Sequence, residues 1–275
     1  MGFAGWIASI LGKGSAQNRK FSSFAELRAA VLEALPKYCE EVENVVEDAR
    51  DPAVFSARIN GKEQTGDVSN LYGYLSSYVD LETNEQIEKY VRAFNGKRVV
   101  NRDNIIFTLR TKDYIDYIDK QFHNAIAEPF LGELNKFYMI DLPDSLSHLK
   151  RDEMPISSVS ELSVLALGNI QKWLPNIEIN QSIRPILLYT LKDNPLLISS
   201  MLVLDEFWVS IEQAVGPDVY FAIPRRDQLF ILDATNSDVV PTLRKVVEYT
   251  FQANFALLSH GIYRRRNGKL EVVSA

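Results

Sequence analysis

The stretch Val219-Tyr-Phe-Ala-Ile-Pro-Arg-Arg-Asp-Gln-Leu-Phe-Ile-Leu232 holds two apolar runs, 219–223 and 229–232, on either side of a short polar connection. Two apolar runs separated in this way are typical of a β-hairpin. A second hairpin is predicted at 263–273, because Asn267-Gly268 is a strong hairpin turn pair and lies between two strand-like runs. Helical periodicities alternate with such hairpins, so the sequence predicts an α+β fold with antiparallel hairpins and a mixed sheet packed against helices.

Outward from this stretch, the same patterns assign the rest of the chain. Ser23 and Glu26 have the spacing of a capping box, so we expect a helix that begins at Phe24 and is ended or kinked by Pro36. The apolar run Leu197–Val215 predicts one largely buried helix. The other predicted elements are a hairpin of 43–49 and 54–60, helices at 83–95, 158–170 and 239–255, and strands at 105–109, 136–142 and 186–191. We divide the chain into an extension and linker at 1–20 and two α+β subdomains at 21–135 and 136–275.

Composition restricts the classes of function. The 275 residues carry a formal charge of −6, which disfavours nucleic acid as the main partner and favours a more basic protein; a homodimer stays open. A single cysteine, Cys39, allows no internal disulfide and suits a cytoplasmic location. No apolar run is long enough to cross a membrane. We expect no metal and no cofactor, since no paired cysteines, close histidine pair or phosphate-loop motif occurs.

The N-terminal extension carries an apolar stripe with helical spacing, formed by Phe3, Trp6, Ile7, Ile10 and Leu11. Three interpretations stay open. The helix packs on its own core, docks on a partner protein, or rests on a membrane surface with nearby basic residues facing the lipid headgroups.

Two charged groups are candidate sites. Asp141 and Asp144 flank a proline at a strand end, where they would bind a divalent ion, act as a general base, or simply cap a turn. Arg225 and Arg226 lie in the connection of the first hairpin with Asp227 beside them. Guanidinium groups on a rigid hairpin are suited to gripping a carboxylate or a phosphate, with Asp227 orienting one of them; a solvated turn is the alternative.

Four segments of the second half look like those of one family: Asp141-Leu-Pro-Asp-Ser145, Glu161-Leu-Ser-Val-Leu-Ala-Leu-Gly-Asn-Ile170, Leu202-Val-Leu-Asp-Glu-Phe-Trp208 and Ala222-Ile-Pro-Arg-Arg-Asp-Gln-Leu229. They resemble the YtpQ-like family, a group of uncharacterised bacterial proteins. The resemblance is strongest from about Phe137 onward and implies a bacterial cytosolic setting and an α+β fold. It transfers no catalytic residue. The chain departs from the family pattern at Phe107, where a proline is usual.

These observations favour a non-enzymatic protein-binding protein, such as an immunity or adaptor protein that covers a basic partner. One alternative is a hydrolase or phosphate-handling enzyme that uses the aspartate pair and the arginine clamp. The other is a peripheral membrane protein.

Overall fold

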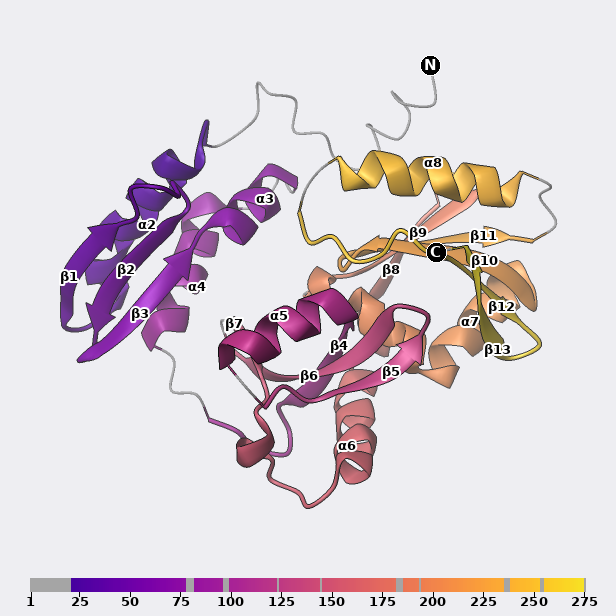
Figure 1. The fold of residues 1–275 in the computed structure, drawn as a ribbon. Helices are drawn as coiled ribbons and strands as arrows, with labels where there is room; N and C mark the ends of the chain where they lie inside the picture. The colour runs from indigo at the N-terminus through magenta and orange to yellow at the C-terminus, as the bar shows by residue number, and fades with distance from the viewer. Residues whose placement is uncertain are drawn as a thin grey trace. The chain divides into compact units, whose positions relative to one another are not determined.

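The computed structural model describes residues 21–77, 82–95, 99–122, 124–143, 145–181, 185–192, 194–234, 238–252 and 255–274 (Figure 1). The chain forms two compact units, Met1–Val99 with Leu142–Ser145, and Val100–Asp141 with Leu146–Ala275. We call them unit 1 and unit 2. Helices and antiparallel sheets make up both units, which confirms the predicted α+β fold.

Unit 1 packs helices on a three-stranded antiparallel sheet of order β1-β2-β3. Its elements are α2 (Phe24–Tyr38), β1 (Val42–Glu47), β2 (Val54–Ile59), β3 (Lys62–Asp67), α3 (Ser69–Ser77) and α4 (Thr83–Asn95). The core lies between the sheet and the helices, and Leu27, Val31 and Leu35 of α2 meet Phe55 and Ile59 of β2 there. The predicted hairpin of 43–60 is therefore β1 and β2.

The capping pattern predicted at Ser23 is present in part. The Ser23 hydroxyl accepts a hydrogen bond from the backbone N–H of Glu26 at 3.2 Å, while the Glu26 carboxylate accepts from the N–H and hydroxyl of Ser22. Pro36 lies inside α2, two residues before the helix ends. A proline in the last turn removes one hydrogen bond near the helix end and shortens the helix rather than breaking it.

Unit 2 contains two antiparallel sheets with helices on their faces. Its elements are β4 (Ile105–Thr111), α5 (Lys112–Phe122), β5 (Ala127–Leu131), β6 (Leu134–Leu142), β7 (Ser145–His148), η2 (Arg151–Glu153), α6 (Val159–Gln171), η3 (Leu174–Asn176), β8 (Ile177–Asn180), β9 (Ile186–Leu191), η4 (Pro195–Val203), α7 (Asp205–Val215), β10 (Asp218–Arg225), β11 (Gln228–Asp233), α8 (Val239–Phe251), β12 (Ile262–Arg266) and β13 (Lys269–Ser274).

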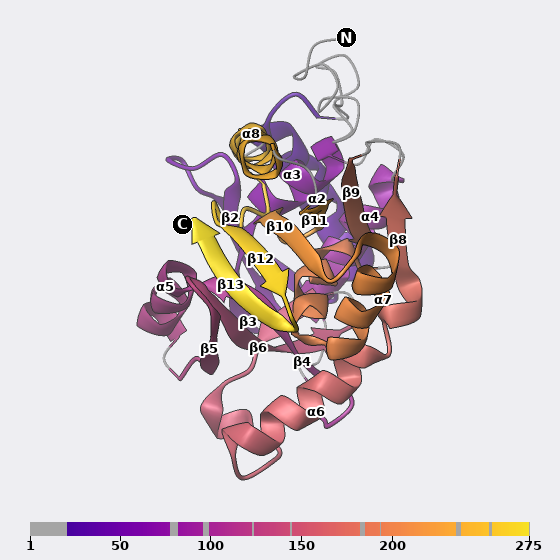
Figure 2. The same cartoon turned by 90° about the vertical axis from the view of Figure 1, so that its right-hand side faces the viewer.

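The larger sheet has the order β13-β12-β10-β11-β9-β8, with α8 on one face and α7 on the other (Figures 1 and 2). Both predicted hairpins lie in it, as β10–β11 and β12–β13. Asn267 and Gly268 have φ angles of 51° and 73° and connect the paired residues Arg266 and Lys269, as the Asn-Gly pattern predicts.

The smaller sheet has the order β4-β6-β5, and β7 also pairs with β6. Helices α5 and α6 cover opposite faces of it (Figure 1). Neighbouring residues of β6 show this: the Phe137 ring contacts Tyr114 of α5, whereas Lys136 donates a hydrogen bond to Ser163 of α6. The expected subdomain boundary between residues 135 and 136 falls inside β6. This strand pairs with β4 and β5, which precede it in the sequence, and with β7, which follows it, so the boundary would divide one sheet.

The prediction of one helix over Leu197–Val215 is wrong. The chain forms the 3-10 helix η4 and then the α-helix α7, separated by Leu204 in an extended conformation. Both η4 and α7 bury apolar side chains, so the sequence is apolar on both sides of Leu204. Hydrophobicity alone therefore does not reveal that the helix is interrupted there. In the described part of the chain no helix is long and apolar enough to cross a membrane.

Candidate functional site

Arg225 and Asp227 form a buried ion pair at the end of the β10–β11 hairpin. Nε and one terminal nitrogen of Arg225 donate to the two carboxylate oxygens of Asp227, at 2.9 and 2.6 Å. The side chains are 2% and 0% exposed, and the guanidinium stacks 4.8 Å from the centre of the Phe255 ring. Arg225 is thus held inside the protein, and the sequence-based picture of two arginines projecting from the hairpin does not apply to it.

Arg226 lies half-buried beside this pair, and a third arginine joins it. Arg110 of β4 is 4% exposed, donates to the carbonyl oxygen of Leu109 at 2.8 Å and stacks 5.2 Å from the centre of the Tyr114 ring. We call Arg110, Tyr114, Arg225, Arg226 and Asp227 the arginine cluster. Its members come from β4, the start of α5 and the hairpin turn of unit 2, and the charge of Arg226 acts on Arg110.

The electrostatics of the arginine cluster follow from burial and like charge. Burial, together with the neighbouring charge of Arg226, lowers the pKa of Arg110 to about 9. Burial also lowers the pKa of Arg226, and Arg225 adds to this, while Tyr114 and Asp227 oppose it. Positive charge is therefore concentrated at a place where water stabilises it poorly.

Of the two predicted aspartates, only Asp141 belongs to the described residues. Asp141 is the last residue of β6 that belongs to unit 2, and burial raises the pKa of its carboxyl group. Asp144 lies outside the described residues. Among the residues that the structure does describe, no group of three histidine, cysteine, aspartate or glutamate side chains is arranged to hold a metal ion.

A different acidic surface lies on unit 1. In the described sheet β1 pairs on one side only, with β2, and it exposes the apolar side chains Val45 and Val46 by 44% and 61%. Exposed acidic residues surround these valines: Glu40, Glu41, Glu43, Glu47 and Asp48. We call β1 with these residues the acidic edge. A bulge between Glu43 and Val46, with Asn44 at a φ of 49°, interrupts its pairing with β2.

Arg28 of α2 holds the turn that follows the acidic edge. One terminal nitrogen donates to the carbonyl oxygens of Asp48, Asp51 and Val54 at 3.1–3.2 Å, and the other forms an ion pair with Glu47. Because one buried guanidinium ties three backbone carbonyls to the helix, the acidic edge has a fixed backbone before any partner arrives.

Unit 2 also contains a serine–lysine contact that the sequence did not predict. Nζ of Lys136 lies 3.1 Å from the Ser163 hydroxyl and 3.0 Å from the Glu128 carboxylate, which also accepts from the Tyr138 hydroxyl. A serine–lysine catalytic pair needs a neutral amine as its base. Lys136 instead forms an ion pair with Glu128, so the group fits a structural link between β6, β5 and α6.

The remaining reactive side chains have structural partners. Cys39 is buried, donates to the carbonyl oxygen of Val91, and burial raises the pKa of its thiol. In the basic run of β12, Arg264 forms a bidentate ion pair with Asp218, and Arg265 pairs with Glu212 at 2.7 Å. Arg266 also lies 3.6 Å from the Asp218 carboxylate, so each arginine of the run has a carboxylate partner within the protein.

The apolar stripe of Phe3, Trp6, Ile7, Ile10 and Leu11 lies outside the described residues. Its three interpretations stay predictions.

No family model, curated protein or solved structure matches the chain. The resemblance to the YtpQ-like family therefore rests on the sequence segments alone.

Arg110 was not predicted from the sequence, because a charged residue in an apolar strand does not indicate which side chains surround it in the folded protein. The acidic edge had a visible signal, because Glu40–Asp51 holds six acidic residues and one basic residue.

Proposed function

We propose that this chain is a non-enzymatic protein-binding protein that engages a basic partner through the acidic edge of unit 1. The observation that carries the proposal is an exposed strand edge with two exposed valines among acidic side chains. An unpaired edge offers backbone hydrogen bonds to an extended segment of another protein. The valines supply apolar contact, and the carboxylates select a partner segment rich in lysine or arginine.

Charge complementarity favours this partner over others. Five exposed carboxylates line the acidic edge, and only Glu47 is engaged by a buried arginine. An acidic segment would be repelled, and an apolar one would leave these carboxylates unbalanced. The bulge shortens the part of β1 that is available for regular strand pairing. The carboxylates therefore contribute more to the selectivity for a partner than backbone pairing does.

The setting that fits this activity is the bacterial cytosol, with the chain acting as an immunity or adaptor protein of YtpQ-like type. The hydrolase alternative lacks support from the described residues, because Arg225 is tied to Asp227 and Asp144 is not described. Homodimer formation stays a possible assembly state and is a separate question from the acidic edge.

The proposal is tested with a short peptide of alternating lysine and valine, labelled for fluorescence anisotropy. We expect saturable binding that weakens as salt concentration rises. The double variant Glu41→Lys/Glu43→Lys should weaken the Kd at least tenfold, which corresponds to about 1.4 kcal/mol. Both residues are exposed, so the fold should be unaffected.

Glu178→Lys is the matched control. Glu178 is an exposed residue of β8, the edge strand of the six-stranded sheet, where it is the single acidic residue of the strand. The control variant should bind the peptide as tightly as the parent chain. The double variant changes the net charge by +4 and the control by +2, so a loss of binding free energy half as large in the control as in the double variant would show that net charge alone drives binding. An unchanged Kd in the double variant would remove the acidic edge from consideration.

A further inference from the structure

Strand β8 leaves one edge of the six-stranded sheet open. In the described part of the chain it is an outermost strand and pairs with β9 alone (Figure 2). The backbone N–H of Lys192 donates to the carbonyl oxygen of Asn176 at 3.0 Å, and hydrogen-bonded pairs alternate along an antiparallel ladder. The backbone groups of Glu178 and Asn180 therefore point toward β9, whereas the N–H and C=O of Ile179 point away from it and lie at the open edge.

The smaller sheet of unit 2 protects its edges in ways that β8 does not. In β4 the carbonyl oxygens that point away from β6 accept hydrogen bonds of 2.8 Å from three side chains: Asn169 to Ile105, Ser200 to Phe107, and Arg110 to Leu109. In β5 a position that points away from β6 is held by Pro129, which has no N–H to offer. Open strand edges invite pairing with another chain, so proteins commonly cover them. Among the described residues, no side chain bonds to the backbone of Ile179.

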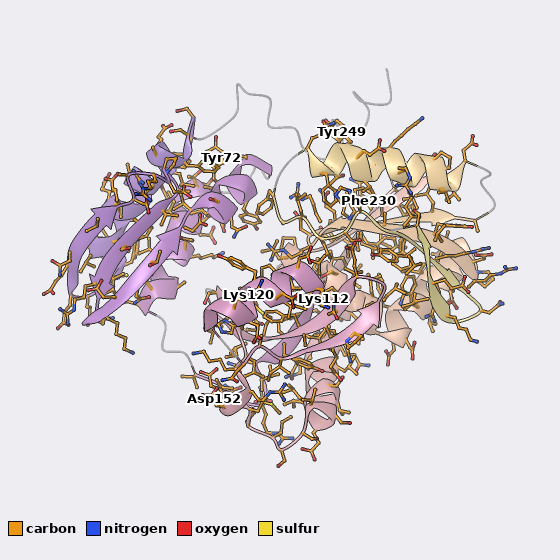
Figure 3. All side chains as sticks on the ribbon, in the orientation of Figure 1. Tyr72, Lys112, Lys120, Asp152, Phe230 and Tyr249 are labelled. Carbon is orange, nitrogen blue, oxygen red and sulfur yellow. The ribbon has the colours of Figure 1, made fainter. Side chains whose placement is uncertain are left out.

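The apolar interior of the larger sheet extends onto β8 without being covered there. Near the middle of the sheet, Phe230 of β11 is buried and lies between the sheet and α8 (Figure 3). On the other face, Tyr189 of β9 is buried and its ring packs against Phe207 of α7. Ile179 lies directly opposite Tyr189 on that face, yet 44% of it is exposed. The open edge of β8 therefore offers an apolar side chain together with unpaired backbone groups.

We propose that a second copy of this chain pairs with β8 in antiparallel fashion about Ile179, which joins two six-stranded sheets into one. In this register Ile179 meets its own copy, and Glu178 lies opposite Asn180 of the second copy, so that no like charges meet. A pairing centred on Glu178 would place two carboxylates opposite each other. One centred on Ile177 is weakened, because the N–H of Ile177 already donates to the carbonyl oxygen of Leu174. Two-fold pairing of identical surfaces is the commonest form of protein assembly.

Charge and geometry favour a second copy over the other candidate partners. Strand β8 carries a single acidic residue, so it does not select the basic segment proposed for unit 1. The acidic edge is unsuited to self-pairing, because its carboxylates would repel those of the second copy. Strand β13, the other outer strand, carries a bulge between its pairs with Ile262 and Tyr263, which interrupts regular pairing. Pairing at β8, in unit 2, is independent of binding at the acidic edge, in unit 1.

The test measures the mass of the full chain by sedimentation velocity over about a hundredfold range of concentration. We expect an equilibrium between the chain mass of 31.3 kDa and twice that mass. Ile179→Lys should raise the dimer Kd by about tenfold or more, because two like charges would meet at the centre of the pairing. Ile179→Pro, which removes the outward N–H and leaves the bonds to β9 intact, should act in the same direction. Val273→Lys is the matched control on β13, where Val273 is 40% exposed, and should leave the Kd unchanged.

Oxidative cross-linking tests the register directly. In the proposed pairing the two Cα atoms at position 179 lie about 5.5 Å apart, a separation that a disulfide spans. Mild oxidation of Ile179→Cys should therefore link two chains, whereas Glu178→Cys and the parent chain, whose Cys39 is buried, should stay unlinked. A parent chain that is monomeric throughout the concentration range overturns the proposal. So does a dimer whose Kd is unchanged in Ile179→Lys, or one that is lost only in Val273→Lys.

Discussion

Removing one partner of the Arg225–Asp227 pair should destabilise unit 2 far more than removing both. Each side chain is at most 2% exposed, and two charge-assisted hydrogen bonds join them. Asp227→Asn leaves a buried guanidinium without its carboxylate, and Arg225→Met leaves a buried carboxylate. Each single variant should lose about 3–5 kcal/mol of unfolding free energy, the typical cost of an unpaired buried charge.

The double variant Arg225→Met/Asp227→Asn leaves no buried charge from this pair. Its loss should therefore be well below the sum of the two single losses, with a coupling energy of about 2–4 kcal/mol. Asp227→Asn should be the more harmful single change, because Asp227 also offsets the charge of Arg226.

The free energies are measured by urea unfolding followed by tryptophan fluorescence, in a Trp6→Phe background. Trp173 and the buried Trp208 both belong to unit 2, so the signal reports that unit even if unit 1 unfolds separately. Additive losses in the double variant, or single losses under about 1 kcal/mol, would refute the reasoning that the pair is buried and mutually dependent.

Three further predictions address other parts of the chain. Deletion of Met1–Lys20 should shift the melting temperature by no more than a few degrees if the stripe serves a partner or a membrane; a large loss, measured by calorimetry, would place it in the core. Gly66→Ala should lower the free energy of unfolding by about 1–3 kcal/mol, because the new Cβ would lie 2.3 Å from ring atoms of Phe55. Gly168→Ala, where nothing lies within 4 Å of the new Cβ, should stabilise the helix by about 0.5–1 kcal/mol, and similar urea midpoints for both variants would contradict this. Asp141→Asn should be more stable than the parent at pH 7 and equally stable below about pH 3, because burial raises the carboxyl pKa in the folded state and the parent loses stability as pH rises through that pKa. A stability difference between the two proteins that is the same at both pH values, measured from unfolding curves, would disprove this.

Local patterns predicted the hairpins of this fold because their turn chemistry is local. Asn267-Gly268 adopts the left-handed conformation that its residue types favour, and the apolar runs around Arg225 and Arg226 pair as expected. Strand β3 and helix α5 escaped prediction. Lys62–Asp67 is almost entirely polar and takes its strand conformation from pairing with β2. Helix α5 is different, because Tyr114, Ile115 and Ile118 do have the spacing of an apolar helix face, a local signal that we did not use.

The candidate sites show the same limit. The sequence identified Arg225, Arg226 and Asp227 as a charged turn, but whether an arginine points inward depends on what covers the turn. Phe255, 28 positions after Asp227 and on the far side of α8, supplies that cover for Arg225. The charge of Arg226 acts on Arg110, which lies 116 positions away in the sequence. Contacts between residues more than 100 positions apart leave no trace in local spacing.

The acidic edge is tested most directly by hydrogen–deuterium exchange of the full chain with and without the lysine–valine peptide. We predict slower exchange of backbone amides in 42–47 when the peptide is bound, no change in the β8 edge strand at 177–180, and loss of the effect in Glu41→Lys/Glu43→Lys. Peptide binding that leaves exchange in 42–47 unchanged would contradict the central claim.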